Sequence, residues 1–157
     1  MFLGRTPEEA EAFEVESFAN VGALVMGRRL FDVGVGPWGD NPTFHAPCFV
    51  VSHRSAARLK REGGTSYTFV TDGIESALEQ ARAAAAGKTV MVMGGANIVD
   101  QYVGGGFVDE IVIHLVPVVL GAGTRLFDRV DNAPIEFERT QVIQGPDATH
   151  LRFRLVR

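Results

Sequence analysis

The stretch Thr89-Val90-Met91-Val92-Met93-Gly94-Gly95-Ala96-Asn97-Ile98 joins an apolar run to two glycines and then to the start of a helical segment. An unbroken apolar run of this length is typical of a strand that is covered on both faces. The two glycines would let the backbone approach a bound diphosphate, with the N–H groups of the next helix pointing at it. The stretch is not the Gly-x-Gly-x-x-Gly fingerprint, and the alternative is a tight connection that needs small residues for packing, but we favour the ligand site.

Strands and helices alternate on either side of this stretch. Apolar runs predict strands at 21–26, 49–52, 67–71, 89–93 and 110–116. Helical spacing and caps predict helices at 6–20, 28–33, 72–86 (with Asp72 as the cap) and 96–103, a short polar helix or turn at 55–62, and a loop at 34–47. Two further strands, at about 136–143 and 149–156, form a terminal hairpin. This order predicts a three-layer α/β fold, with a mostly parallel sheet, helices on both faces and an antiparallel C-terminal hairpin.

Two other strand ends carry side chains that suit an anion. Gly27 would let the backbone turn sharply, and Arg28 and Arg29 follow it with guanidinium groups that match phosphate oxygens. The segment Ser52-His53-Arg54 places a hydroxyl, an imidazole and a guanidinium after the next apolar strand. Taken singly, a solvated basic helix start and a polar turn explain these ends equally well or better. Three anion-friendly ends in one parallel sheet nevertheless favour a phosphorylated nucleotide, and NADPH over NADH.

Composition limits the other functions. The 157 residues indicate one domain, 1–157, and the net charge of −4 lacks the basic field that nucleic acid or an anionic membrane requires. Cys48 is the only cysteine, which is usual in a reducing compartment, and no targeting or membrane-spanning stretch is recognisable, so we expect a cytoplasmic protein. The four histidines have no metal-ligand spacing, and we expect no metal site. His114, inside an apolar strand, is predicted to be a core or edge residue.

The motifs 25–29, 51–54 and 92–98 together resemble the dihydrofolate reductase-like family. The segment 114–127, His-Leu-Val-Pro-Val-Val-Leu-Gly-Ala-Gly-Thr-Arg-Leu-Phe, is similar to the branch formed by the C-terminal domain of riboflavin-biosynthesis reductases. The resemblance runs from about Thr6 to Arg157. It implies NADPH bound across the sheet, with a cis peptide between the two glycines. The implied cofactor-binding residues are Gly27, Arg28, Arg29, Ser52, His53, Arg54, Thr71, Gly94, Gly95, Ala96, Asn97 and Ile98.

Two departures from the family pattern are visible. Leu30 stands where such proteins often have threonine, which removes one hydroxyl donor to phosphate. The family's first strand, which lies centrally in the sheet, has no counterpart before Thr6, so we expect a truncated start and an apolar slot in the sheet.

The resemblance implies an NADPH-dependent reductase that transfers hydride to a heterocyclic substrate, pterin or pyrimidine-like, or to a small carbonyl compound. The alternative is a non-catalytic nucleotide-binding or oligomer-forming domain that has lost its N-terminal catalytic segment; a flavin or another nucleotide in the same cradle is a third possibility. No catalytic acid can be named: Glu11 lies in roughly the right helix, but a surface carboxylate is the stronger interpretation. We also expect a homodimer that forms through the exposed edge of the last strand, 151–155.

Overall fold

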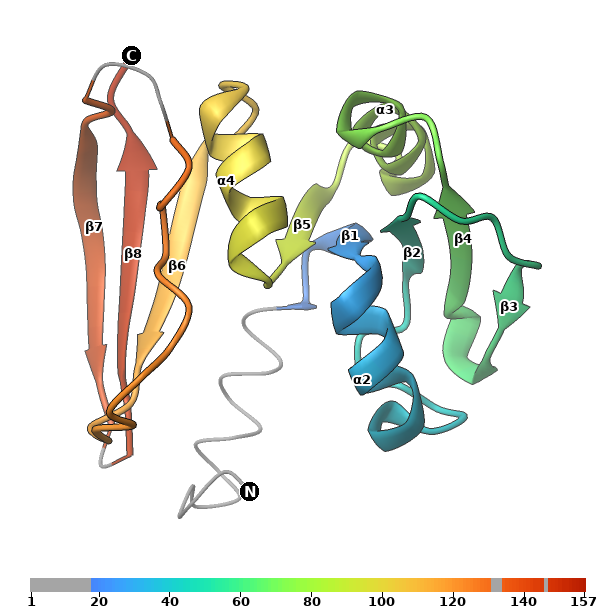
Figure 1. Ribbon diagram of the computed structural model, residues 1–157, viewed down its shortest axis with the longest axis horizontal. Coiled ribbons are helices and arrows are strands. Elements are labelled where there is room, and N and C mark those ends of the chain that lie inside the picture. The colour runs from blue at the N-terminus through green and yellow to red at the C-terminus, as the bar shows by residue number, and fades with distance from the viewer. Residues whose placement is uncertain (1–17, 131–133, 146) are drawn as a thin grey trace. The chain divides into compact units, whose positions relative to one another are not determined.

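The computed structural model describes residues 18–130, 134–145 and 147–157 (Figure 1). Contacts divide the described residues into a parallel-sheet unit, residues 18–99, and an antiparallel-sheet unit, which holds the described residues from 100 to 157. We describe each unit separately, and the expectation of a single domain stays a prediction. Most of the expected helix at 6–20, including Glu11, lies outside the described residues.

The parallel-sheet unit contains a five-stranded sheet with the order β3-β4-β2-β1-β5. Strands β4, β2, β1 and β5 run parallel, and β3 pairs antiparallel with β4 at the edge. The strands are β1 (Val21–Gly27), β2 (Pro47–Val51), β3 (Leu59–Lys60), β4 (Ser66–Val70) and β5 (Thr89–Met93). The mostly parallel sheet predicted from the apolar runs is confirmed.

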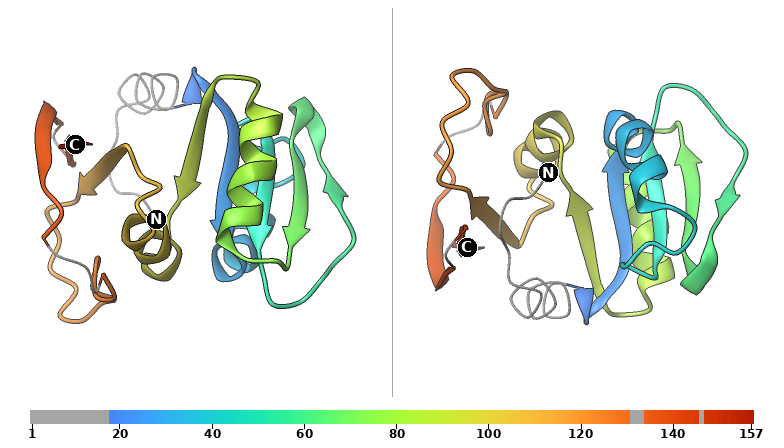
Figure 2. Two further views of the ribbon diagram at one scale, coloured as in Figure 1. Left: turned by 90° about the horizontal axis from the view of Figure 1, so that it is seen from above. Right: turned by 90° about the horizontal axis from the view of Figure 1, so that it is seen from below.

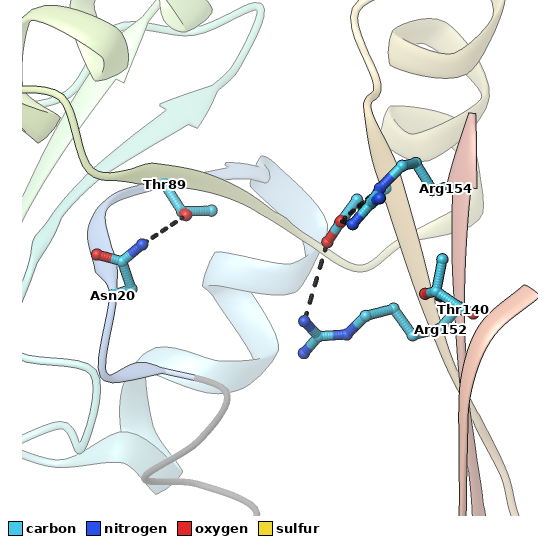
Figure 3. Close-up of polar contacts among 6 residues, drawn as sticks. Asn20, Thr89, Thr140, Arg152 and Arg154 are labelled. Atoms are coloured by element: carbon cyan, nitrogen blue, oxygen red, sulfur yellow. Dashed lines mark hydrogen bonds and ion pairs between the residues drawn. The ribbon is translucent and has the colours of Figure 1, made fainter. Parts of the chain in front are cut away.

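Helices cover both faces of this sheet. Helix α2 (Arg28–Trp38) packs on one face, and α3 (Ile74–Ala85) packs on β1, β2 and β5 at the other (Figure 2). Gly22 makes the close approach of α3 possible, because a Cβ there would lie 2.6 Å from the carbonyl oxygen of Ala85. At the same end of the sheet, Asn20 Nδ2 donates to Thr89 Oγ1 at 3.4 Å (Figure 3). The unit is therefore three-layered, as predicted.

Helix α2 is longer than the sequence predicts, because it continues to Trp38 through the residues expected to form a loop. The indole of Trp38 occupies the space beside Gly34, where a Cβ would lie 2.4 Å from the ring. The indole also packs against Phe44 and Tyr67, at centroid distances of 5.5 and 6.4 Å. Tertiary packing of an aromatic anchor thus overrides the weak helix propensity of Gly34, Gly36 and Pro37.

Three local predictions in this unit are wrong. The segment 55–62 forms no polar helix; it contains β3, which pairs with β4, and it ends at the start of the 3₁₀ turn η1 (Glu62–Gly64). Asp72 does not cap α3, whose N-cap is Gly73 with no side-chain hydrogen bond. Strand β5 is only partly buried rather than covered on both faces, because it is an edge strand of its sheet.

The antiparallel-sheet unit is built on strands β6 (Glu110–Leu115), β7 (Phe137–Gln144) and β8 (Thr149–Leu155). Their order is β6-β8-β7, so β8 is hydrogen-bonded on both sides. The predicted hairpin is confirmed. However, the expected free edge at 151–155 is wrong, because both edges of the last strand already have partners. Helix α4 (Ala96–Gly104) begins in the parallel-sheet unit and ends in this one.

The two faces of the three-stranded sheet differ in character. One face lines a cavity of about 460 Å³ whose walls are entirely apolar side chains, including Ile111, Ile113 and Phe153. On the other face, Glu110 lies between Arg154 and Arg152, with N–O distances of 3.3 and 3.9 Å (Figure 3). Among the residues that the structure describes, no helix has the length and apolar character needed to cross a bilayer.

Candidate functional site

The carboxyl ends of the parallel strands meet at one edge of the sheet. Gly27 is level with Val51 and Val51 is level with Val70, while Met93 pairs with Met26, one residue before the end of β1. Ligands in open parallel sheets bind at this edge. The residues that follow the strands and share the edge are Arg28, Ser52, Thr71 and Gly94. The structure therefore brings the predicted strand ends together.

Gly27 does not have the role expected from the sequence. Its backbone is ordinary extended chain, with φ −77° and ψ 154°, so no sharp turn depends on a glycine there. A Cβ at this position would lie 3.8 Å from Cβ of Ile98, which is ordinary contact. Gly27 thus serves as the N-cap of α2 in the space beside the first turn of α4.

Arg28 is already engaged within the protein. Its Nε donates to Asp32 Oδ1 at 2.7 Å, and its guanidinium carbon lies 5.3 Å from the centroid of the Phe69 ring. The Arg28–Asp32 pair is one helical turn apart, so the i, i+4 spacing was a signal in the sequence that the motif comparison overlooked. This pairing makes Arg28 a weaker phosphate ligand than the motif suggests.

Arg29, His53 and Arg54 are exposed basic side chains at this edge. Within residues 18–130 and the other described segments, neither Arg29 nor Arg54 forms an ion pair. Ser52 is 6% exposed, and its hydroxyl donates to the carbonyl of Arg54 at 2.8 Å while accepting from the Arg54 N–H at 3.1 Å. Ser52 therefore shapes the turn that presents His53 and Arg54.

Asp72 adds a negative charge at the same edge of the sheet. It follows Thr71 at the end of β4, and the Thr71 hydroxyl lies 3.5 Å from Asp72 Oδ1, the outer limit of a hydrogen bond. Both side chains are exposed. A carboxylate at this edge disfavours a nearby phosphate and can accept from a ribose hydroxyl, so the preference for NADPH depends on the arginines outweighing it.

The loop Gly94-Gly95 has the backbone that only glycine adopts readily. The two φ angles are +32° and +84°, and the described residues contain no cis peptide, so the expected cis bond is not present. The positive φ angles turn the chain instead, beside Leu30, whose Cδ2 would lie 3.9 Å from a Cβ on Gly94.

Helix α4 begins directly after this loop, with Ala96, Asn97 and Ile98 in its first turn. The amides of Ile98 and Val99 donate to the carbonyl of Gly95, at 3.1 and 3.2 Å. The start of α4 carries the partial positive charge of a helix N-terminus. The main-chain N–H groups before α4 and the guanidinium groups of Arg29 and Arg54, which form no ion pair among the described residues, are donors of the kind that bind phosphate oxygens.

This architecture is an α/β fold of the dihydrofolate reductase-like class. The chain belongs to the RibD C-terminal domain family, whose sequence profile matches residues 5–151. The comparison with curated proteins found no significant match.

Solved structures show the same fold at low sequence identity. A putative riboflavin biosynthesis protein from Shewanella sp. PV-4 has a TM-score of 0.78 and 21% identity over 98% of this chain and 84% of its own. Dihydrofolate reductase from Enterococcus faecalis, solved in complex with NADP(H), has a TM-score of 0.64 and 16% identity over 97% of this chain and 83% of its own.

A third similar structure is a longer protein. The Thermotoga maritima diaminohydroxyphosphoribosylaminopyrimidine deaminase/5-amino-6-(5-phosphoribosylamino)uracil reductase has a TM-score of 0.66 and 13% identity over 96% of this chain. The match covers 50% of that protein, so this chain corresponds to about half of its length.

Proposed function

We propose that the chain is an NADPH-dependent reductase that transfers hydride to a heterocyclic substrate, pterin or pyrimidine-like, or to a small carbonyl compound. The observation that carries the proposal is the carboxyl edge of the parallel sheet, where a positive-φ glycine loop lies in the same unit as Arg29 and Arg54, two exposed arginines that form no ion pair with any described residue. The reductases and the NADP(H) complex among the similar structures support the same activity.

Different side chains of the chain would have different roles in binding the cofactor. Arg29 and Arg54 would hold the phosphate on the adenosine ribose, because exposed guanidinium groups bind phosphate oxygens through paired hydrogen bonds. His53 would add a donor, and the buried hydroxyl of Ser52 keeps the turn in shape. Arg28 would act by holding the first turn of α2 in place through Asp32.

The glycine loop and the start of α4 would bind the diphosphate. Main-chain N–H groups of Gly95 and Ala96 precede the first helical hydrogen bond, which Ile98 donates. Such groups, together with the helix dipole, favour an anion without a charged side chain. When bound, the reduced nicotinamide would supply the hydride, and the chain would orient it and exclude water.

Nucleotide titrations of variants test how the arginines and Asp72 at the carboxyl edge of the sheet affect cofactor affinity. Removing one charge-assisted hydrogen bond costs about 1.5–3 kcal/mol, which is roughly a 10- to 100-fold loss of affinity. We expect this loss for NADPH, with little change for NADH, in Arg29→Ala and in Arg54→Ala. Arg28→Ala should lose less, and Asp72→Asn should bind NADPH more tightly.

Arg82→Ala is the matched control, because Arg82 lies in the last turn of α3, at the opposite end of the sheet. Isothermal titration calorimetry on the unmodified chain should show tighter binding of NADPH than of NADH. Equal affinities for the two nucleotides would rule out the proposed phosphate site.

Turnover is tested separately from binding. NADPH oxidation, followed by its absorbance, is measured with a pterin, a ribosylated pyrimidine and a small carbonyl compound. Oxidation that depends on one of these substrates supports the reductase. Tight NADPH binding without oxidation by any of them would instead support the non-catalytic nucleotide-binding alternative.

A further inference from the structure

Two histidines far apart in the sequence meet on the antiparallel-sheet unit. His114 in β6 lies directly opposite His150 in β8 in the strand register. Their Nδ1 atoms are 2.8 Å apart, and their ring centroids are 5.0 Å apart with an interplanar angle of 66°. Because 36 residues separate them, no ligand spacing was visible in the sequence.

We propose that His114 and His150 chelate one divalent transition-metal ion, Cu²⁺ or Ni²⁺, through their two Nδ1 atoms. Imidazole nitrogen is a preferred ligand for both ions. The pair stands on a rigid scaffold, since β6 and β8 are hydrogen-bonded along Glu110–Leu115 and Thr149–Arg154. The two ligands therefore need no large chain movement to be brought together.

The distance between the two Nδ1 atoms favours one coordination geometry for the metal. Metal–imidazole bonds are about 2.0–2.1 Å long. With such bonds, a right angle at the metal places the two nitrogens roughly 2.9 Å apart, and a tetrahedral angle places them roughly 3.4 Å apart. The hydrogen-bonded separation of 2.8 Å lies closer to the right-angle value than to the tetrahedral one, so right-angle coordination needs the smaller change in the distance between the two Nδ1 atoms. Square-planar or tetragonal coordination is typical of Cu²⁺ and Ni²⁺, whereas Zn²⁺ prefers the tetrahedral angle.

Metal binding to the neutral pair requires one imidazole proton to move from Nδ1 to Nε2, and the number of bound protons stays the same. In the metal-free pair of neutral rings, one Nδ1–H donates to the other Nδ1. A metal needs both Nδ1 lone pairs, so the donor ring must carry its proton on Nε2 instead. A rotation of each ring about its Cβ–Cγ bond then turns the two lone pairs toward a common point beside the line that joins the nitrogens.

Solvent can supply the other coordination positions. His114 is exposed and His150 is partly exposed, so an ion can reach both. In the part of the chain that the structure describes, no group of three or more metal-ligating side chains is found. Arg152 and Arg154 lie on the same face as His150, and Glu110, 3.9 and 3.3 Å from them, offsets one of the two positive charges. Two imidazoles plus water make a weaker site than a closed set of four protein ligands.

Calorimetric titration of the full chain, free of any histidine tag, with CuCl₂ or NiCl₂ at neutral pH tests the proposal. We expect one ion per chain. His114→Ala and His150→Ala should each weaken binding at least tenfold, while His53→Ala, which removes an exposed histidine from the other unit, should not. Zn²⁺ should bind more weakly than Cu²⁺.

A second readout separates ligation from loss of fold. Ni²⁺ should raise the Tm of the unmodified chain and leave that of a folded His114→Ala variant, checked by circular dichroism, unchanged. Binding that survives in both single variants, or one ion shared by two chains, would overturn the proposal. Undetectable binding of both Cu²⁺ and Ni²⁺ to the unmodified chain would also overturn it.

Discussion

Three arginines follow strand ends at the carboxyl edge, and their surroundings make them unequal. Arg28 is paired with Asp32 and stacked near Phe69, whereas Arg29 and Arg54 are exposed. An arginine that must give up a carboxylate to bind phosphate gains less than one that gives up only water. At the residue scale, we therefore expect two of the three arginines, Arg29 and Arg54, to contribute most of the affinity for phosphate.

A substitution at Gly95 can test whether the glycine loop binds the cofactor or only connects β5 to α4. At φ +84° a β-branched side chain is strained, and it would also cover the N–H groups in front of α4. We expect Gly95→Val to lower NADPH affinity at least tenfold while the far-UV circular dichroism spectrum stays the same. Gly36→Ala is the control, because a Cβ there meets no atom within 4 Å. Unchanged affinity in a folded Gly95→Val protein would mean that the glycines serve only the strand-to-helix connection.

At the scale of the elements, neighbouring strands β2 and β4 bury two ionisable side chains side by side. Cys48 is level with Tyr67 in the register, and both are fully buried. Burial raises the pKa of the Cys48 thiol to about 12. It also raises the pKa of Tyr67 to about 12, with a further contribution from Cys48 that Arg61 partly opposes. These strands therefore require both groups to stay neutral.

Alkaline pH should consequently weaken the parallel-sheet unit. In the unfolded chain Cys48 ionises near pH 9.0 and Tyr67 near pH 10.0, whereas in the folded chain both ionise near pH 12. The stability due to their neutral forms is fully present below about pH 9. It falls as pH rises toward about 12, by about 1.4 kcal/mol per pH unit for each group that titrates only in the unfolded chain.

Urea unfolding at about pH 8 and about pH 10.5 measures this loss. The double variant Cys48→Ala, Tyr67→Phe should lose less stability over this interval than the unmodified chain. Some loss should remain, because burial also raises the pKa of Tyr102 to about 12. An equal loss in both proteins would show that other groups cause the alkaline sensitivity.

At the scale of the whole molecule, we propose that the chain forms a homodimer. The last strand cannot provide the edge, because β8 is paired on both sides and Phe153 lines the apolar cavity of the same sheet. The segment after β6 offers another surface, since Val119 is 97% exposed and Leu120 is 83% exposed. Adjacent apolar side chains with this exposure favour burial against a second copy.

Light scattering at micromolar concentration tests the dimer. We expect twice the chain mass of 17.0 kDa for the unmodified protein, and the chain mass itself for Val119→Asp, Leu120→Asp. Val33→Asp is the control, because Val33 is an exposed apolar residue of α2 in the other unit. A monomeric unmodified protein would contradict the proposal, and a dimer that persists in the double variant would place the interface elsewhere.

The sequence by itself determined the elements whose signals are local. The apolar run at 89–93, the glycines that follow it and the alternation along 149–155 predicted β5, the loop before α4 and β8, because strand periodicity and glycine turns depend on neighbouring residues only. The parallel direction of the strands followed from their alternation with helices along the chain.

Only the tertiary structure decided the features that join distant residues. Helix α2 extends to Trp38 because Phe44 and Tyr67 hold its indole, and β3 exists because β4 lies beside it. The same holds for the His114–His150 pair, which the pairing of β6 with β8 creates. The free energy of each feature comes from packing or hydrogen bonding between separate segments, and no window of local sequence contains both partners.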